Sequence, residues 1–192
     1  ALTERELPAL VDRLLGQIER SLRPGGWLLL HEYVGPRQFQ FPDSQLRIVA
    51  RLLGALPERL RRDSTTGEVK CEYVRRPPAW WNLADPSEAI CSDLILSEVE
   101  RRFEVVDRRD YGGAVLHLLL EHIVQNFEAG RPDDARWIRI LGEIEAILQE
   151  SGTVASDFVL VGARKRPGID EQRTSFARRL VRRIAREFAG GR

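Results

Sequence analysis

Apolar residues recur at spacings of three and four along the first part of the chain, between Leu7 and Leu22. This spacing is typical of an amphipathic helix with one buried stripe, and Pro8 fits its first turn, where a missing N–H costs least. Pro24, Gly25 and Gly26 then supply the residues of a tight turn. The pattern predicts a helix that ends in a turn.

An unbroken apolar run from Trp27 to Leu30 follows this turn and gives way to His31, Glu32 and Tyr33. Such a run is typical of a strand that is covered on both faces, as in parallel sheets. In open α/β sheets the ligand crevice lies beyond the carboxyl ends of the strands. The run therefore predicts a buried strand with a candidate site at its polar tip.

Two further helices are predicted before the second strand. Asp43 fits the cap of a helix that extends to Leu60, and the sequence from Asp85 to Glu88 is a helix-start signal for a helical region that extends to Arg102. Between them, over residues 63–82, the periodicity disappears. A long segment of this makeup is either a lid or a mobile connection.

The rest of the pattern predicts an α/β domain over residues 1–166. Residues 103–109 indicate a second strand, residues 115–127 and 133–148 two helices, and residues 158–162 a third strand, again apolar on both faces. We expect three strands with helical insertions between them.

Residues 167–192 predict a separate basic amphipathic helix at the C-terminus. Its apolar positions are Phe176, Leu180, Val181, Ile184 and Phe188. Its other face is rich in arginine, so it can lie on an anionic membrane surface or pack on a partner or on the chain itself. We favour packing over membrane contact, because five apolar residues make a modest stripe.

Composition narrows the classes of partner. With 31% charged residues and a net charge of +1, the chain has no general affinity for polyanions, and we expect no nucleic-acid partner. Cys71 and Cys91 lack the paired spacing of a zinc site, which favours two inert thiols.

The sequence also bears on localisation. No apolar run is as long as a membrane span, and the N-terminus lacks a signal pattern, so we expect a cytoplasmic protein. The sequence has no methionine, so either an initiator was removed before Ala1 or the chain begins inside a longer product.

The polar tip of the first strand holds the candidate catalytic residues, His31 and Glu32. As neighbours on a strand they point to opposite faces, so both cannot meet one substrate atom. One of them fits a general base, and a histidine imidazole suits that task near neutral pH. The alternative is that one packs under a helix while the other caps a neighbouring amide.

Candidate binding residues follow in two groups. Tyr33, Arg37, Gln38 and Phe39 fit an acceptor pocket with aromatic walls, or else an ordinary loop with Phe39 in the core. The segment over residues 63–82 carries Tyr73, Arg76 and Trp80 together with Arg75 and Trp81. As a lid it suits a sugar or a phosphorylated acceptor; the alternative is a solvated turn with its tryptophans packed on a helix.

Two other features carry weaker signals. His117 and His122 are five positions apart, which is not a spacing that brings two ligands to one helix face, so we predict structural histidines and no metal. Gly112 and Gly113 precede a predicted helix. A glycine pair there can cradle an anion, but an ordinary turn is favoured.

The order of these elements resembles the second half of class I S-adenosylmethionine-dependent methyltransferases. The helix, the Pro-Gly-Gly turn and the strand that ends in polar residues resemble the entry to that family's fifth strand. The later strands fit its sixth and seventh, which form an antiparallel pair at the sheet edge. Residues 31–40, Tyr111 with Gly112 and Gly113, and residues 156–158 look like bacterial members of uncertain acceptor. The resemblance implies part of a Rossmann-like sheet with strands of mixed direction, and it adds Tyr111 to the substrate-binding candidates.

One departure from that family limits what this chain can do alone. The family binds its cofactor with a glycine-rich turn that precedes the matched elements, and no Gly-x-Gly occurs in this chain. The resemblance therefore implies S-adenosylmethionine as cofactor but no cofactor-binding residues here. If the opening strand normally lies in mid-sheet, its exposed edge seeks a partner. We expect a homo-oligomer, or a missing N-terminal half, that pairs with residues 27–33.

The functional expectation is methyl transfer from S-adenosylmethionine to a small-molecule or carbohydrate-like acceptor, with this chain on the acceptor side. Methyl transfer needs mainly alignment of the two reactants, so it does not require a base. The alternative is a non-catalytic binding or scaffolding module derived from a methyltransferase.

Overall fold

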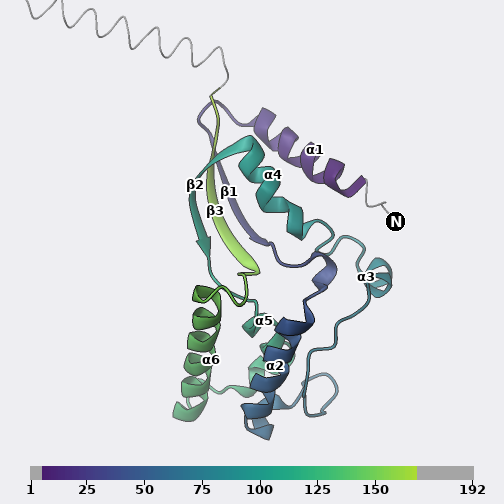
Figure 1. Cartoon of the computed structure of the whole chain (residues 1–192), viewed down its shortest axis with the longest axis vertical. Helices are drawn as coiled ribbons and strands as arrows, with labels where there is room; N and C mark the ends of the chain where they lie inside the picture. The colour runs from purple at the N-terminus through teal and green to yellow at the C-terminus, as the bar shows by residue number, and fades with distance from the viewer. Residues whose placement is uncertain (1–5, 168–192) are drawn as a thin grey trace, which may run out of the picture.

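The upper part of the molecule is built around a three-stranded sheet, in a computed structural model that describes residues 6–167 (Figure 1). The strands are β1 (Trp27–Tyr33), β2 (Phe103–Asp110) and β3 (Phe158–Lys165), in the order β1-β3-β2. β3 lies in the middle and is antiparallel to both neighbours. The α/β class is as predicted, but the expectation of mixed strand directions is wrong. An apolar run indicates that a strand is buried, but it does not indicate whether the strand runs parallel or antiparallel to its neighbours.

One face of the sheet is covered by α1 (Glu6–Ser21) and α4 (Ile95–Arg102), and on that face Val161 is fully buried. On the opposite face Leu29 is 76% exposed and Leu160 is 43% exposed. We call this second face the open face. The prediction that the first and third strands are covered on both faces is therefore wrong for residues 6–167, because no described helix packs on the open face.

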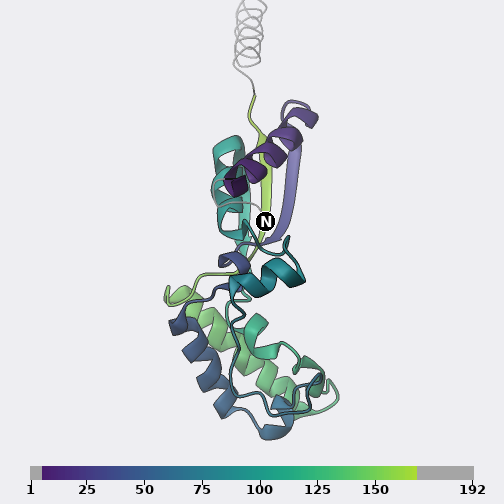
Figure 2. The ribbon, with the colours of Figure 1, turned by 90° about the vertical axis from the view of Figure 1, so that its right-hand side faces the viewer.

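The lower part of the molecule is a helical unit of α2 (Asp43–Ala55), α5 (Leu116–Leu120) and α6 (Pro132–Glu150), joined end to end with the sheet unit (Figure 2). It has its own apolar cluster. The buried members are Phe41, Val49, Leu53, Leu56, Leu60, Val115, Leu118, Leu119, Ile123 and Leu141. The helical unit therefore has a core separate from that of the sheet.

The predicted helix start at Asp85 is wrong. The Asp85 carboxylate accepts hydrogen bonds from the backbone N–H and the hydroxyl of Ser87, at 3.0 and 2.7 Å. This local turn competes with helix formation, a known property of aspartate and serine. The helical region begins only at η3 (Ser92–Leu94), a 3₁₀ turn that leads directly into α4.

Other boundaries also differ from the prediction. α2 ends at Ala55 and a 3₁₀ turn, η2 (Glu58–Arg61), follows it, because Pro57 cannot continue the hydrogen-bond ladder. α5 ends at Leu120, and another 3₁₀ turn, η4 (Val124–Asn126), follows it.

The segment without periodicity contains a helix of its own, α3 (Pro78–Ala84), which places two tryptophans on a helical turn. Among the described residues no helix is long and apolar enough to cross a bilayer. Residues 168–192 lie outside the described part, so the predicted C-terminal helix and the domain boundary at residue 166 stay predictions.

Candidate functional site

Aromatic rings connect the tip of β1 to α3 through an unbroken series of contacts. The successive pairs are His31 with Tyr111, Tyr111 with Phe158, Phe158 with Tyr33, Tyr33 with Phe39, Phe39 with Trp81, and Trp81 with Trp80, at centroid separations of 4.8–6.0 Å. We call this series the aromatic chain. It unites five of the predicted site residues, His31, Tyr33, Phe39, Trp80 and Tyr111, which come from four segments of the sequence.

His31 begins the aromatic chain on the open face of the sheet. Its Nε2 shares a hydrogen bond with the hydroxyl of Tyr111, which follows β2. The strand register places His31 opposite Leu160, whereas Glu32 is opposite the fully buried Val159. The two predicted catalytic residues thus face opposite sides, as the alternation predicts, and only His31 joins the other candidates.

The middle of the aromatic chain lies where the sheet unit meets the helical unit. Tyr33 donates a hydrogen bond from its hydroxyl to the Pro36 carbonyl at 3.0 Å, and burial together with the nearby Asp157 raises its pKa well above the usual range. His117 on α5 contacts the rings of Tyr33, Phe39 and Phe158. Burial lowers the pKa of His117, which fits the predicted structural histidine.

Arg37 and Gln38 lie in or beside η1 (Arg37–Phe39), and both hold neighbouring segments in place. Arg37 makes a two-pronged ion pair with Asp93, with both N–O distances 3.1 Å. Gln38 donates from Nε2 to Oδ1 of Asn82 on α3 at 3.0 Å. The neighbouring Gln40 donates from Nε2 to the Arg76 carbonyl at 2.8 Å. Neither Arg37 nor Gln38 is among the residues that line a pocket beside α3.

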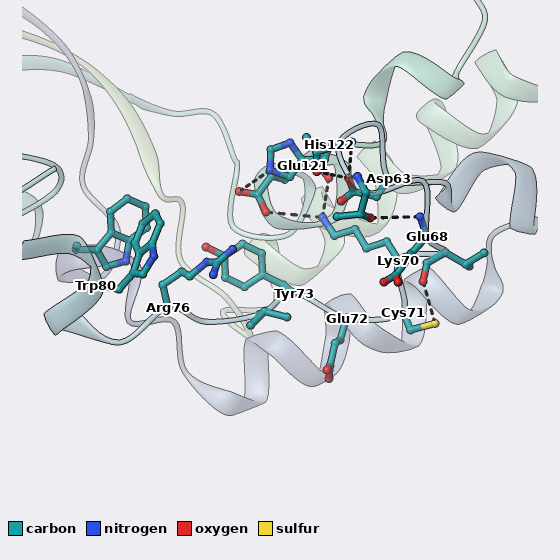
Figure 3. A pocket seen from close by; sticks show the side chains of 15 residues that line it. Asp63, Glu68, Lys70, Cys71, Glu72, Tyr73, Arg76, Trp80, Glu121 and His122 are labelled. Carbon is teal, nitrogen blue, oxygen red and sulfur yellow. Dashed lines mark hydrogen bonds and ion pairs between the residues drawn. The ribbon is translucent and has the colours of Figure 1, made fainter. Parts of the chain in front are cut away.

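A pocket of about 500 Å³ lies beside α3, and we call it the α3 pocket (Figure 3). It contains the predicted Tyr73, Arg76 and Trp80. Its lining residues are Asp63, Thr65, Thr66, Glu68, Val69, Lys70, Cys71, Glu72, Tyr73, Val74, Arg76, Trp80, Trp81, Glu121 and His122. Four of the five predicted lid residues, all except Arg75, therefore line this pocket.

The cations of the α3 pocket already have partners. Lys70 donates from Nζ to the carbonyl oxygens of Leu118 and Glu121, at 2.7 and 2.8 Å, and burial lowers its pKa. The Arg76 guanidinium lies over the Trp80 ring, 4.9 Å from its centroid. Burial, with a further contribution from Glu121, raises the pKa of Tyr73 to about 12. Tyr73 is therefore protonated and able to donate a hydrogen bond.

The sequence reasoning missed several of these neighbours. Phe158 links Tyr111 to Tyr33, and no local signal marks it, because its position depends on the register of β3. Glu121 reaches the α3 pocket because α5 ends at Leu120 and the chain turns, with φ +59° at His122. The apolar pattern of residues 115–127 predicted one continuous helix and gave no sign of this turn.

The glycine pair after β2 forms a turn filled by protein groups. Both glycines have positive φ, +105° at Gly112 and +87° at Gly113. A Cβ at Gly112 would lie 2.6 Å from a carboxylate oxygen of Glu145. The same carboxylate accepts hydrogen bonds from the backbone N–H groups of Gly113, Val115 and Leu116, at 2.6–3.1 Å. An anion has no place here, in agreement with the favoured turn.

Metal ligands and thiols add little to the site. The described residues contain no group of three side chains able to hold a metal ion. Cys71 is exposed, whereas Cys91 is buried, and burial raises the pKa of its thiol.

Comparison with known proteins found no matching family, no similar curated protein and no similar solved structure. The resemblance in the sequence therefore stays a prediction. Function has to be inferred from the contacts within the chain.

Proposed function

We propose that this chain supplies the acceptor side of an S-adenosylmethionine-dependent methyltransferase that acts on a small-molecule or carbohydrate-like acceptor. The observation that carries the proposal is the position of β1. In the described part of the chain it is an edge strand, and an apolar groove of about 660 Å³ runs along it, lined by α1, β1, residues 87–92 and Ile95. An unpaired apolar edge is a site for another strand, which fits a sheet that continues in a further polypeptide segment.

The arrangement of β2 and β3 gives further support. They form an antiparallel pair, which is what the resemblance implies for the sixth and seventh strands. Either a missing N-terminal half or a second copy of the chain would pair with residues 27–33.

The described residues do not fit the cofactor by themselves. The only glycine pair that follows a strand in this part of the chain is occupied by Glu145 and packed against Phe158. What this chain contributes is the acceptor side: on the open face, His31 accepts the acceptor's proton at Nδ1, while its Nε2–H donates to the Tyr111 hydroxyl, which holds the imidazole in place.

The occupied glycine turn also favours the second candidate function, a non-catalytic binding module. A module of that kind needs only the α3 pocket, because binding does not depend on a cofactor.

Titration calorimetry separates the two. We expect no heat from S-adenosylmethionine added to this chain alone. The longer polypeptide that the codons upstream of Ala1 encode together with this chain, called the product below, should contain a strand, a Gly-x-Gly turn and an acidic residue. It should bind the cofactor one to one and transfer the cofactor's methyl group. If that product neither binds nor transfers, the binding module is the correct interpretation.

A further inference from the structure

The α3 pocket has an aromatic wall with one open ring. Trp80 is 40% exposed, with Arg76 over its ring and Trp81 perpendicular to it at 4.8 Å. Tyr73 is anchored from behind by an edge contact with Phe41. Exposed aromatic rings beside polar groups bind ligands that have both flat apolar faces and hydrogen-bonding edges.

Two groups on this wall can donate a hydrogen bond to a ligand. The indole Nε1 of Trp81 is buried and has no hydrogen-bond partner in the described part of the chain. Buried donors are normally paired, so an unpaired one in a pocket wall calls for an acceptor. The protonated hydroxyl of Tyr73 is a second donor. Ligand hydroxyl groups satisfy both.

The side chains that line the α3 pocket carry a net negative charge. Four carboxyl side chains line it against two cations, and both cations are engaged, Lys70 by two carbonyl oxygens and Arg76 by the Trp80 ring. The Glu121 carboxylate forms ion pairs with Lys70 Nζ and His122 Nε2, each at 3.9 Å, which is longer than a hydrogen bond. Its oxygens can therefore still accept a hydrogen bond from a ligand, and the acidic lining disfavours a phosphate.

We propose that the α3 pocket binds a saccharide that carries a protonated amine. The sugar's C–H face lies on Trp80, its hydroxyl groups meet Trp81 and Tyr73, and its ammonium group donates to Glu121. A phosphorylated sugar, one of the two acceptors that the sequence suggested, is disfavoured by the acidic lining. The binding of this sugar does not rest on the proposed function, because His31 does not line the α3 pocket; the pocket is a site separate from the one where His31 meets the methyl acceptor.

Saturation-transfer NMR on the full chain tests the proposal with three matched probes, glucosamine, glucose and glucose 6-phosphate. A charge-assisted hydrogen bond makes glucosamine bind about tenfold more tightly than glucose, and glucose 6-phosphate should bind most weakly. No transfer to any probe, equal affinity for glucosamine and glucose, or tightest binding of the phosphate would overturn the proposal.

Variants locate the binding. Trp80→Ala should abolish it, and Glu121→Gln should remove the preference for glucosamine. The matched control is Trp27→Ala, because Trp27 is also exposed and also lies beneath an arginine, Arg164 at 4.7 Å, but on the open face. Equal loss in Trp27→Ala and Trp80→Ala would contradict the assignment.

The proposed function can fail separately. Binding of glucosamine to a cofactor-loaded product that transfers no methyl group to any acceptor would leave this inference standing and overturn the proposed function. Methylation of an acceptor that is not a sugar, with no sugar binding, would do the reverse. Should Trp80→Ala fail to fold, as judged by circular dichroism, Glu121→Gln provides the test alone.

Discussion

His31 on β1 and Tyr111 after β2 share a hydrogen bond across β3, although 80 positions separate them in the sequence. The contact exists because β1 and β2 are both antiparallel to β3, which lies between them, so that their carboxyl ends lie at the same end of the open face. Tyr111 also contacts Phe158 at the start of β3. The imidazole is thereby held by a residue that itself packs on the central strand.

The first prediction concerns this pair. If His31 accepts the acceptor's proton, His31→Asn lowers kcat of the cofactor-loaded product by about 100-fold or more, and Tyr111→Phe by about tenfold, because the imidazole loses its orientation. Because the hydrogen bond is solvent-exposed, Tyr111→Phe should cost at most about 1 kcal/mol of unfolding free energy. Methyl-transfer kinetics and denaturant unfolding measure the two effects.

Glu32→Gln is the control for this experiment, since Glu32 is the neighbour of His31 and faces the opposite side. It should leave kcat unchanged. A loss in Glu32→Gln as large as that in His31→Asn would show that the open face is not the acceptor side.

Asp157 makes the stability of the chain depend on pH. Its side chain is buried, and burial raises its pKa from 3.8 to about 6. The folded state thus binds this proton more tightly than the unfolded state, so Asp157 contributes stability below about pH 4 that is lost as pH rises to about 6. Asp157→Asn should remove this slope and stabilise the chain at pH 7 by up to about 3 kcal/mol. Urea unfolding at pH 4, 5, 6 and 7 measures it; identical slopes in both proteins would refute the prediction.

Glu145 should be far more important for stability than its neighbour on the same helix, Glu143. Its buried carboxylate accepts three backbone N–H groups at the start of α5. In Glu145→Gln one oxygen becomes a donor that faces other donors, which should cost about 2–3 kcal/mol. Glu143 is exposed, so Glu143→Gln should change the unfolding free energy by less than about 0.5 kcal/mol. Thermal and denaturant unfolding of the pair decide this, and similar costs would count against it.

Gly113 is a position where only glycine fits. Its φ is +87°, and a Cβ there would overlap the ring of Phe158. Gly113→Ala should therefore destabilise the chain by more than about 2 kcal/mol, through backbone strain and displacement of the ring. Gly152 also has positive φ, +71°, but nothing lies near its Cβ position, so Gly152→Ala should cost only about 1 kcal/mol. Equal costs in denaturant unfolding would show that the contact with Phe158 is unimportant.

Leu29 should control self-association of the isolated chain. It is 76% exposed on β1, which is one of the two edge strands of the described sheet, and exposed apolar edges pair with other chains. Light scattering should find an oligomer of the unmodified chain and a monomer for Leu29→Lys, because lysine blocks edge pairing. Leu83 on α3 is 88% exposed, and Leu83→Lys should leave the oligomer intact. A monomer for the unmodified chain would refute the predicted pairing.

Where the pattern of a few neighbouring residues decides the outcome, the sequence was a sufficient guide. The helix up to Ser21, the turn at Gly25 and the strand from Trp27 all form as predicted, and the polar tip of β1 follows. The prediction failed at Asp85 because a second local structure, the Asp85–Ser87 turn, competes with the helix for the same residues. Both outcomes are decided by interactions between residues that are close in the sequence.

The sequence by itself determined the three strands, the positions of the helices other than α3, and the candidate residues at the tip of β1, since hydrophobic spacing and turn chemistry act over a few positions. Only the tertiary structure decided that β3 lies between β1 and β2, that one face of the sheet is open, and that His31 meets Tyr111. It also decided that Glu121 and Lys70 join Trp80 in one pocket. These relationships depend on strand register and on where α5 ends, and both result from packing between distant segments.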